Sequence, residues 1–264
     1  ESGSPLDAGF GHGTHVAGLV ALAAPGAALM PLRVLDRAGR GNVWVLAEAL
    51  MWAVDPDGNP QTDDGAHLDN LSLGTRQPTR LLRGIAALAS CEFDDDDDDD
   101  DDDVSPTPED RARCANGFGA AVLSAAGNDG SANIEVFPAA EQVAGARAVA
   151  ASTAQGTVAP FSNRGGWIRL AAPGDRIVST VPGGAWATWS GTSMAAPLVT
   201  GTAALLLTLP SPSPRPGLAG LRQWDAEDLL KTLEDRSVRL CGSSIRQVYA
   251  AGLNGACVQE PWRC

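Results

Sequence analysis

The sequence predicts an α/β domain built on a mostly parallel β-sheet. Short apolar runs that are typical of buried strands alternate with amphipathic stretches that are typical of helices, and this alternation indicates βα units. The chain has 264 residues, of which 44% are hydrophobic, which is enough for one large domain with a substantial core. We therefore expect residues 1–264 to form a single domain.

Apolar periodicity locates the expected elements along the chain. Four apolar residues one helical turn apart fall on one face of a predicted helix over residues 42–54. Asp225 is placed to cap a further helix. Pro and Ser dominate residues 210–217, where we expect a surface loop. The other expected strands are residues 28–35, 68–73, 120–126 and 146–151, and the other expected helices are residues 12–22, 81–89 and 198–209.

Hydropathy and charge argue against two classes of partner. No apolar run reaches the length of about 18 residues that a transmembrane helix needs. The formal net charge of −13 argues against binding to nucleic acid or to an anionic membrane surface. We therefore expect no nucleic-acid partner and no membrane partner, and we expect a monomer.

Ten consecutive aspartates at residues 94–103 carry most of this charge and leave −3 for the rest of the chain. Ten like charges repel one another and bury no apolar surface, which indicates a solvated loop. A calcium-collecting loop is the alternative, because carboxylates are hard oxygen ligands. A calcium site wants spaced ligands and a turn glycine, which a homopolymer lacks. We therefore expect no metal site and no cofactor.

The five cysteines indicate in which compartment the protein is found. Cys91 and Cys114 flank the aspartate run, and a disulfide between them would close an acidic insert over residues 91–114. No two cysteines form a Cys-x-x-Cys pair, which argues against zinc or a redox motif. Disulfides form outside the cytoplasm, so we expect an extracellular or periplasmic protein, with buried free thiols as the alternative.

Ser193 stands between a small-residue turn and an apolar helix, in the sequence Gly-Thr-Ser-Met-Ala-Ala-Pro. A serine hydroxyl is a poor nucleophile unless a base and an oxyanion site assist it. A helix that starts at this serine points its N-terminal dipole at any developing negative charge. Plain helix capping is the alternative explanation of the same residues.

Two other segments offer a base and an oxyanion donor. His12 opens an apolar stretch in the sequence Gly-His-Gly-Thr-His, and a histidine is suited to take a proton from serine near neutral pH. His12 and His15 could instead form a helix face or a metal pair, but no Glu or Cys stands at ligand spacing. Asn128 ends another apolar run. Its amide can donate to an oxyanion, although Gly and Asn also favour turns.

Together and in this order, the three segments resemble the subtilisin-like serine proteases. The resemblance extends from about residue 11 to residue 237 and implies a three-layer fold with helices on both sides of a mostly parallel sheet. It also implies that His12 is the general base and that Ser193 is the nucleophile. The side chain of Asn128 and the backbone N–H of Ser193 would then donate to the oxyanion.

The resemblance assigns further residues. His15 falls on the second histidine of the family's motif and is then structural. Two segments resemble the family's substrate-binding strands, which would hold an extended peptide through main-chain hydrogen bonds. The residues in these segments are Gly39, Gly41, Ser72, Leu73 and Gly74.

The sequence offers no match for the aspartate of the family's catalytic triad. The family's aspartate lies on a strand about thirty residues before the histidine, in an Asp-Ser/Thr-Gly sequence. Only eleven residues precede His12, so we expect a fragment that lacks this strand, with a protein that has lost the acid as the alternative. Glu1 and Asp7 are the available substitutes, but Glu1 lacks a preceding strand and Asp7 is expected in a loop. Loss of the acid costs about 10⁴ in turnover in the subtilisin triad, so we expect a weak catalyst.

Three functional hypotheses follow. The leading one is a secreted serine endopeptidase that acts on peptides or proteins. The second is a catalytically impaired subtilisin-like protein that binds peptides, and the third is a cation-binding module organised by residues 94–103. Cleavage specificity stays open, because the sequence shows no charged residue at the base of the side-chain pocket expected beyond Asn128.

Overall fold

The computed structural model describes residues 9–93, 106–214, 217 and 220–249, and its centre is a six-stranded sheet. The strand order is β1-β2-β3-β4-β8-β7, and every pairing from β1 to β8 in this order is parallel, as the sequence predicts. The last pair, β8 with β7, is antiparallel. The strands of this sheet are β1 (Leu68–Leu71), β2 (Ala121–Ala125), β3 (Ala146–Ser152), β4 (Ile168–Pro173), β7 (Val238–Arg239) and β8 (Arg246–Gln247).

Helices and a separate hairpin surround the sheet. The predicted helices are confirmed, and Asp225 caps the last α-helix by accepting a hydrogen bond from the backbone N–H of Glu227 at 3.0 Å. The helices are α1 (His12–Ala23), α2 (Val43–Val54), α3 (Arg80–Ser90), α4 (Pro108–Ala115), α5 (Thr192–Leu207), the 3₁₀-helix η1 (Gly220–Gln223) and α6 (Ala226–Asp235), and the antiparallel hairpin consists of β5 (Ile177–Val181) and β6 (Ala185–Trp189).

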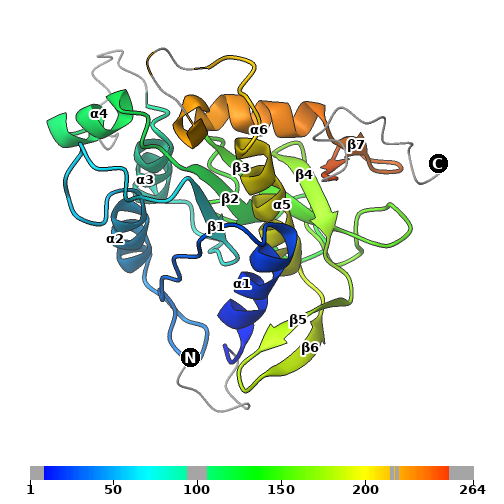
Figure 1. Cartoon of the computed structure of the whole chain (residues 1–264). Helices are drawn as coiled ribbons and strands as arrows, with labels where there is room; N and C mark the ends of the chain where they lie inside the picture. The colour runs from blue at the N-terminus through cyan, green and yellow to red at the C-terminus, as the bar shows by residue number, and fades with distance from the viewer. Residues whose placement is uncertain (1–8, 94–105, 215–216, 218–219, 250–264) are drawn as a thin grey trace.

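The elements form three layers (Figure 1). Successive side chains of a strand point to opposite faces of the sheet. Leu123 of β2 therefore packs into a core with α5 and α6, whereas its neighbour Val122 packs into a second core with α2 and α3. Both residues are fully buried. The helices thus cover both faces, which confirms the predicted three-layer α/β fold.

The prediction of a strand over residues 28–35 is wrong. This segment is irregular, and its one ladder contact is the antiparallel bridge between Leu35 and Gly41. An apolar run becomes a strand only where a neighbouring strand takes up its backbone hydrogen bonds. The edge strand β1 pairs with β2 and with no other described strand, and Leu29 and Met30 are exposed.

Helix α1 lies alongside α5 and is held there by close contacts (Figure 1). A Cβ atom on Gly201 would lie 2.4 Å from the Cβ of Ala23, so glycine permits the two helices to approach. On its other side α1 packs against β5, where Ser179 Oγ donates a hydrogen bond to the backbone oxygen of His15 at 2.8 Å. These contacts hold α1 at both ends, at Ala23 and in the first turn, which begins at His12.

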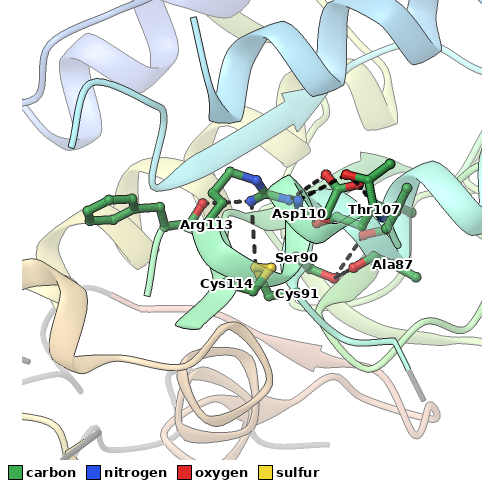
Figure 2. A network of polar contacts seen from close by, with 10 residues as sticks. Ala87, Ser90, Cys91, Thr107, Asp110, Arg113 and Cys114 are labelled. Atoms are coloured by element: carbon green, nitrogen blue, oxygen red, sulfur yellow. Dashed lines mark hydrogen bonds and ion pairs between the residues drawn. A yellow bond between two sulfur atoms is a disulfide. The ribbon is translucent and has the colours of Figure 1, made fainter. Parts of the chain in front are cut away.

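A disulfide closes the acidic insert, as predicted. Cys91 and Cys114 are bonded, and helix α4 begins inside the loop that they close (Figure 2). Thr107 and Asp110 form a capping box at the start of α4, in which each side chain accepts from the backbone N–H of the other residue. The aspartate run at 94–103 lies outside the described residues, as do residues 215 and 216 of the predicted Pro/Ser-rich loop.

Arg113 of α4 ties the insert to the rest of the domain. Its side chain is only 2% exposed, and its guanidinium donates to the backbone oxygens of Leu88 at 2.6 Å and Phe118 at 2.8 Å (Figure 2). The same group lies 3.8 Å from a carboxylate oxygen of Asp110 and 3.5 Å from the sulfur of Cys91. A buried charge is tolerated only when it is paired and hydrogen-bonded in this way.

Replacing Arg113 by Met is expected to lower the free energy of unfolding by about 3–5 kcal/mol, because it leaves the Asp110 charge and two buried carbonyl groups without their donor. Urea unfolding measures the effect. Arg111→Met on the exposed face of the same helix is the matched control and should change stability by less than about 1 kcal/mol. Equal effects of the two substitutions would contradict the assigned role of Arg113.

Asp69 is a buried carboxyl group on the edge strand. It is 8% exposed, and its Oδ2 atom has no hydrogen-bond partner in the part of the chain that the structure describes. Burial raises the pKa of Asp69 to about 7, and the charge of Arg113 opposes this rise only in part. The native state therefore binds a proton here that the unfolded chain has already lost at neutral pH.

This linkage predicts a pH-dependent gain in stability for Asp69→Asn. The contribution of the raised pKa to the free energy of unfolding is fully present below pH 4, and it is lost as the pH rises through about 7. Because Asn does not titrate, the variant should gain stability over the parent between pH 4 and pH 8, by up to about 4 kcal/mol. Urea unfolding at four pH values measures the difference, and a difference that does not change with pH would contradict the prediction.

Candidate active site

The candidate site lies where the parallel strands end. Ser72 follows β1, Asn128 follows β2, and helix α5 begins between them with Ser193 in its first turn. The carboxyl ends of parallel strands share one edge of a sheet, which is where open α/β folds bind ligands. The backbone N–H of Ser193 has no acceptor within the helix, because the first four N–H groups of any α-helix have none.

A proline in α5 helps to attach the helix to this edge. Pro197 has no N–H group, so it cannot bond to the backbone oxygen of Ser193, four residues earlier. The hydroxyl of Ser72 takes this role and donates to that oxygen at 2.9 Å. Asn70 donates to Ser72 Oγ at 3.1 Å, and Thr200 of α5 donates to Asn70 at 3.0 Å. Helix α5 is thereby anchored to β1 at two points.

The hydroxyl of Ser193 is accessible and weakly held. It donates to the backbone oxygen of Ser72 at 3.4 Å, which is long for a hydrogen bond between an O–H group and an oxygen. Ser193 is partly exposed and borders a cavity of about 220 Å³. The cavity is lined by Leu73, Gly74, Thr75, Arg76, Ala125, Gly127, Asn128, Val136, Thr192 and Ser193. A molecule that enters this cavity from solvent can therefore contact the hydroxyl of Ser193.

The amide of Asn128 is oriented by Thr192. The Oδ1 atom of Asn128 accepts from the backbone N–H of Thr192 at 2.8 Å and from the Thr192 hydroxyl at 3.0 Å. A backbone N–H can only donate, so the amide oxygen must face Thr192 and the amide NH₂ must point the other way. Because Asn128 lines the cavity beside Ser193, its NH₂ group is available as a donor there.

Asn163 holds the loop that carries Asn128, and no motif in the sequence assigns it this function. Its side chain is fully buried, accepts from the backbone N–H of Asp129 at 3.0 Å and donates to the backbone oxygen of Ala126 at 3.0 Å. Gly127 lies between these residues with φ +97°, and a Cβ atom there would come within 2.6 Å of the Asn163 amide. The buried amide thus fixes the loop on both sides of Asn128.

His12 is the first residue of α1 and stacks on Trp189. The ring centroids are 6.5 Å apart with an interplanar angle of 16°. Trp189 also stacks on His15 at 4.7 Å and 12°. Trp189 ends β6 and precedes Ser193 by four residues, so one tryptophan links the two motifs. No periodicity or motif in the sequence marks Trp189 for this role.

His15 is buried beside the site. It has no exposed surface, and its Nε2 atom lies 3.2 Å from the backbone oxygen of Ala187. Its ring packs against Trp189 of the β5–β6 hairpin, and its backbone oxygen accepts a hydrogen bond from Ser179 of the same hairpin. These contacts are consistent with the structural role expected for it.

Only some of the predicted substrate-binding residues line the cavity beside Ser193. Leu73 and Gly74 line the cavity beside Ser193, and a Cβ atom on Gly74 would come within 2.4 Å of the Val136 side chain. Gly39 and Gly41 lie in a turn closed by Asp36, whose carboxylate accepts from the backbone N–H groups of Ala38 and Arg40 at 2.9 Å each. This turn does not line the cavity, and its role in binding a peptide stays a prediction. The substitute acids Glu1 and Asp7 lie outside the described residues.

One acidic cluster stands apart from the site. The carboxylate oxygens of Asp55, Asp57 and Asp64 lie within 4.8 Å of one another. Burial raises the pKa of Asp55, and the neighbouring charges of Asp57 and Asp64 raise it further. Asp57 and Asp64 are exposed, and Asp57 accepts a hydrogen bond from the Thr62 hydroxyl at 2.9 Å.

The chain is similar in sequence to known proteins. A model described as "Subtilase family" matches residues 2–238. Subtilisin BL of Lederbergia lenta is 36% identical over 207 residues, which cover 75% of this chain and 63% of that protein. The alkaline protease of Shouchella clausii is also 36% identical over 207 residues, and these cover 45% of its length. This chain thus spans less than two thirds of the length of these relatives.

A solved structure gives the same result. The crystal structure of a cold adapted subtilisin-like serine proteinase matches 91% of this chain and 75% of that chain, with a TM-score of 0.65 and 25% sequence identity. The family model covers most of the sequence, and the histidine, asparagine and serine motifs occur along this fold in that order. The chain belongs to the subtilase family.

Proposed function

We propose that this chain is the greater part of a serine endopeptidase. Ser193 would attack the carbonyl carbon of a peptide bond, and His12 would take the hydroxyl proton and pass it to the leaving amine. The NH₂ group of Asn128 and the backbone N–H of Ser193 would stabilise the tetrahedral oxyanion. Water would then release the acyl group from Ser193, with His12 again as the base.

One observation carries this proposal. Thr192 holds the Asn128 amide with its NH₂ group free for the cavity that Ser193 borders. A donor that is fixed before the substrate arrives stabilises a developing charge without the cost of reorganisation. A turn or a helix cap alone would not require an asparagine here.

The proposal also requires an acid that orients His12. The 264 residues contain no Asp-Ser-Gly or Asp-Thr-Gly sequence, so we propose that this carboxylate comes from a strand outside them. A subtilisin triad without its aspartate loses about 10⁴ in turnover, so we expect slow catalysis by this chain alone. The second candidate function, peptide binding without catalysis, is favoured by the same absence.

Covalent labelling by a fluorophosphonate probe tests the nucleophile. We expect the probe to react with Ser193 and Ser193→Ala to abolish the reaction, because the phosphorus bonds to the serine oxygen. Asn128→Ala should slow labelling by about 10²–10³, which is the effect of removing one oxyanion donor. Mass spectrometry of the labelled peptide gives both the site and the rate.

Two controls make this result decisive. Ser190→Ala removes an exposed hydroxyl three residues away, which bonds to Asp175, and should leave the labelling rate unchanged. A version extended by the residues encoded before Glu1 should label faster than the 264-residue chain if those residues supply the acid. If neither version labels, but both bind peptides, the non-catalytic function is correct instead.

We also propose that the protein is secreted, works as a monomer and needs no cofactor. The bonded Cys91 and Cys114 support an oxidising compartment, since such pairs are rare in the cytosol. None of the described helices is both long enough and apolar enough to cross a membrane.

Chelation tests the proposed independence from metal. Dialysis against EGTA is expected to leave the rate of fluorophosphonate labelling unchanged, because Ser193, His12 and Asn128 do not together form the set of about six to eight oxygen ligands that calcium takes. Asp57→Asn serves as the matched variant, since Asp57 belongs to the acidic cluster described above. A loss of rate on chelation that Asp57→Asn reproduces would contradict the proposal and would place a cation at that cluster.

A further inference from the structure

The cavity beside Ser193 carries its charge at a single position. Leu73, Ala125 and Val136 supply apolar side chains, and much of the remaining lining consists of glycine and small polar residues. Among the described residues that line it, only Arg76 is charged. The side chain that a bound substrate places in this cavity therefore meets an apolar surface and one guanidinium group.

Arg76 is not a free cation, because its guanidinium forms an ion pair with the carboxylate of Asp129. Asp129 is the fixed partner: its side chain is 21% exposed, and its backbone N–H donates to the buried Asn163 amide at 3.0 Å. The side chain of Arg76 is 66% exposed and reaches across from the segment after β1. The two charges therefore cancel next to the cavity.

We propose that the Arg76–Asp129 ion pair determines which side chains the cavity accepts. While the pair is intact, the cavity takes uncharged apolar side chains, because neither charge is left to bind an ionic one. This inference rests on the proposed function in that it concerns the substrate residue whose carbonyl Ser193 attacks. It extends that function by naming two residues that select the substrate.

The physical argument is one of charge balance. Desolvating a charged side chain in an apolar cavity is costly unless an opposite charge meets it there. Removing Arg76 leaves the Asp129 carboxylate to attract a cation, and removing the Asp129 charge leaves Arg76 to attract an anion. Both residues are in contact with solvent, which screens these interactions, so we expect changes of about tenfold rather than several orders of magnitude.

Four proteins test the proposal: the parent chain, Arg76→Gln, Asp129→Asn and the double variant. Each is treated with peptidyl phosphonates that carry Leu, Lys or Glu next to the phosphorus, and the second-order labelling rates of Ser193 are compared. The parent should prefer Leu. Arg76→Gln should raise the Lys/Leu rate ratio about tenfold, and Asp129→Asn should raise the Glu/Leu ratio about tenfold.

The double variant separates charge selection from a general disturbance of the site. It lacks both charges, so its Lys/Leu and Glu/Leu ratios should return to those of the parent even if its absolute rates fall. Arg164→Gln is the matched control, because Arg164 is exposed in the neighbouring loop and does not line the cavity. Its ratios should equal those of the parent.

A second measurement does not depend on catalysis. In the Ser193→Ala background, fluorescent peptides that end in Leu, Lys or Glu should show the same switches in relative Kd. Unchanged ratios in all variants would overturn the inference while leaving the proposed function intact. If the Kd ratios switch but the phosphonates label Ser193 in none of the proteins that retain it, the result supports the inference and contradicts the proposed function.

Discussion

The hydrogen bond from the backbone N–H of Thr192 to the side-chain oxygen of Asn128 connects the two halves of the site. It joins the start of α5 to the loop after β2, and it determines which end of the amide faces the cavity. The Thr192 hydroxyl reinforces the contact, since it donates to the same oxygen and accepts from the backbone N–H of Gly127 at 3.1 Å. One residue therefore positions both the start of α5, which carries the proposed nucleophile, and the amide of Asn128, the proposed oxyanion donor.

Burial of polar groups elsewhere follows two different patterns. Arg113 is nearly inaccessible, yet its donors meet two backbone oxygens and a carboxylate, so it stabilises the insert beside the disulfide. Asp69 is buried with an oxygen that has no partner among the described residues, and its pKa rises accordingly. The difference lies in the number of hydrogen-bond partners, because desolvation acts on both groups.

Local pattern was sufficient for most of the fold but not for all of the site. The helix over residues 42–54 and the buried strand at 120–126 follow from periodicity, which depends on nearest neighbours in the sequence. Residues 28–35 have the same apolar character but no strand beside them, and pairing is a property of the whole sheet. Trp189 and Asn163 were missed for the same reason, because their contacts join segments far apart in the chain.

The Arg76–Asp129 pair shows the same limit at the level of chemistry. Either residue alone would suggest a charged cavity. An uncharged cavity can be inferred only because the two residues are adjacent in space and form an ion pair. Fifty-three positions separate them in the sequence, so no local motif could reveal that their charges cancel. Asp129 also directly follows Asn128, and Asn163 fixes both of its polar ends, through the backbone N–H and through a 3.4 Å contact with the carboxylate. The loop that presents the proposed oxyanion donor thus also presents the carboxylate that neutralises Arg76, so the proposed chemistry and the proposed choice of side chain depend on the same loop.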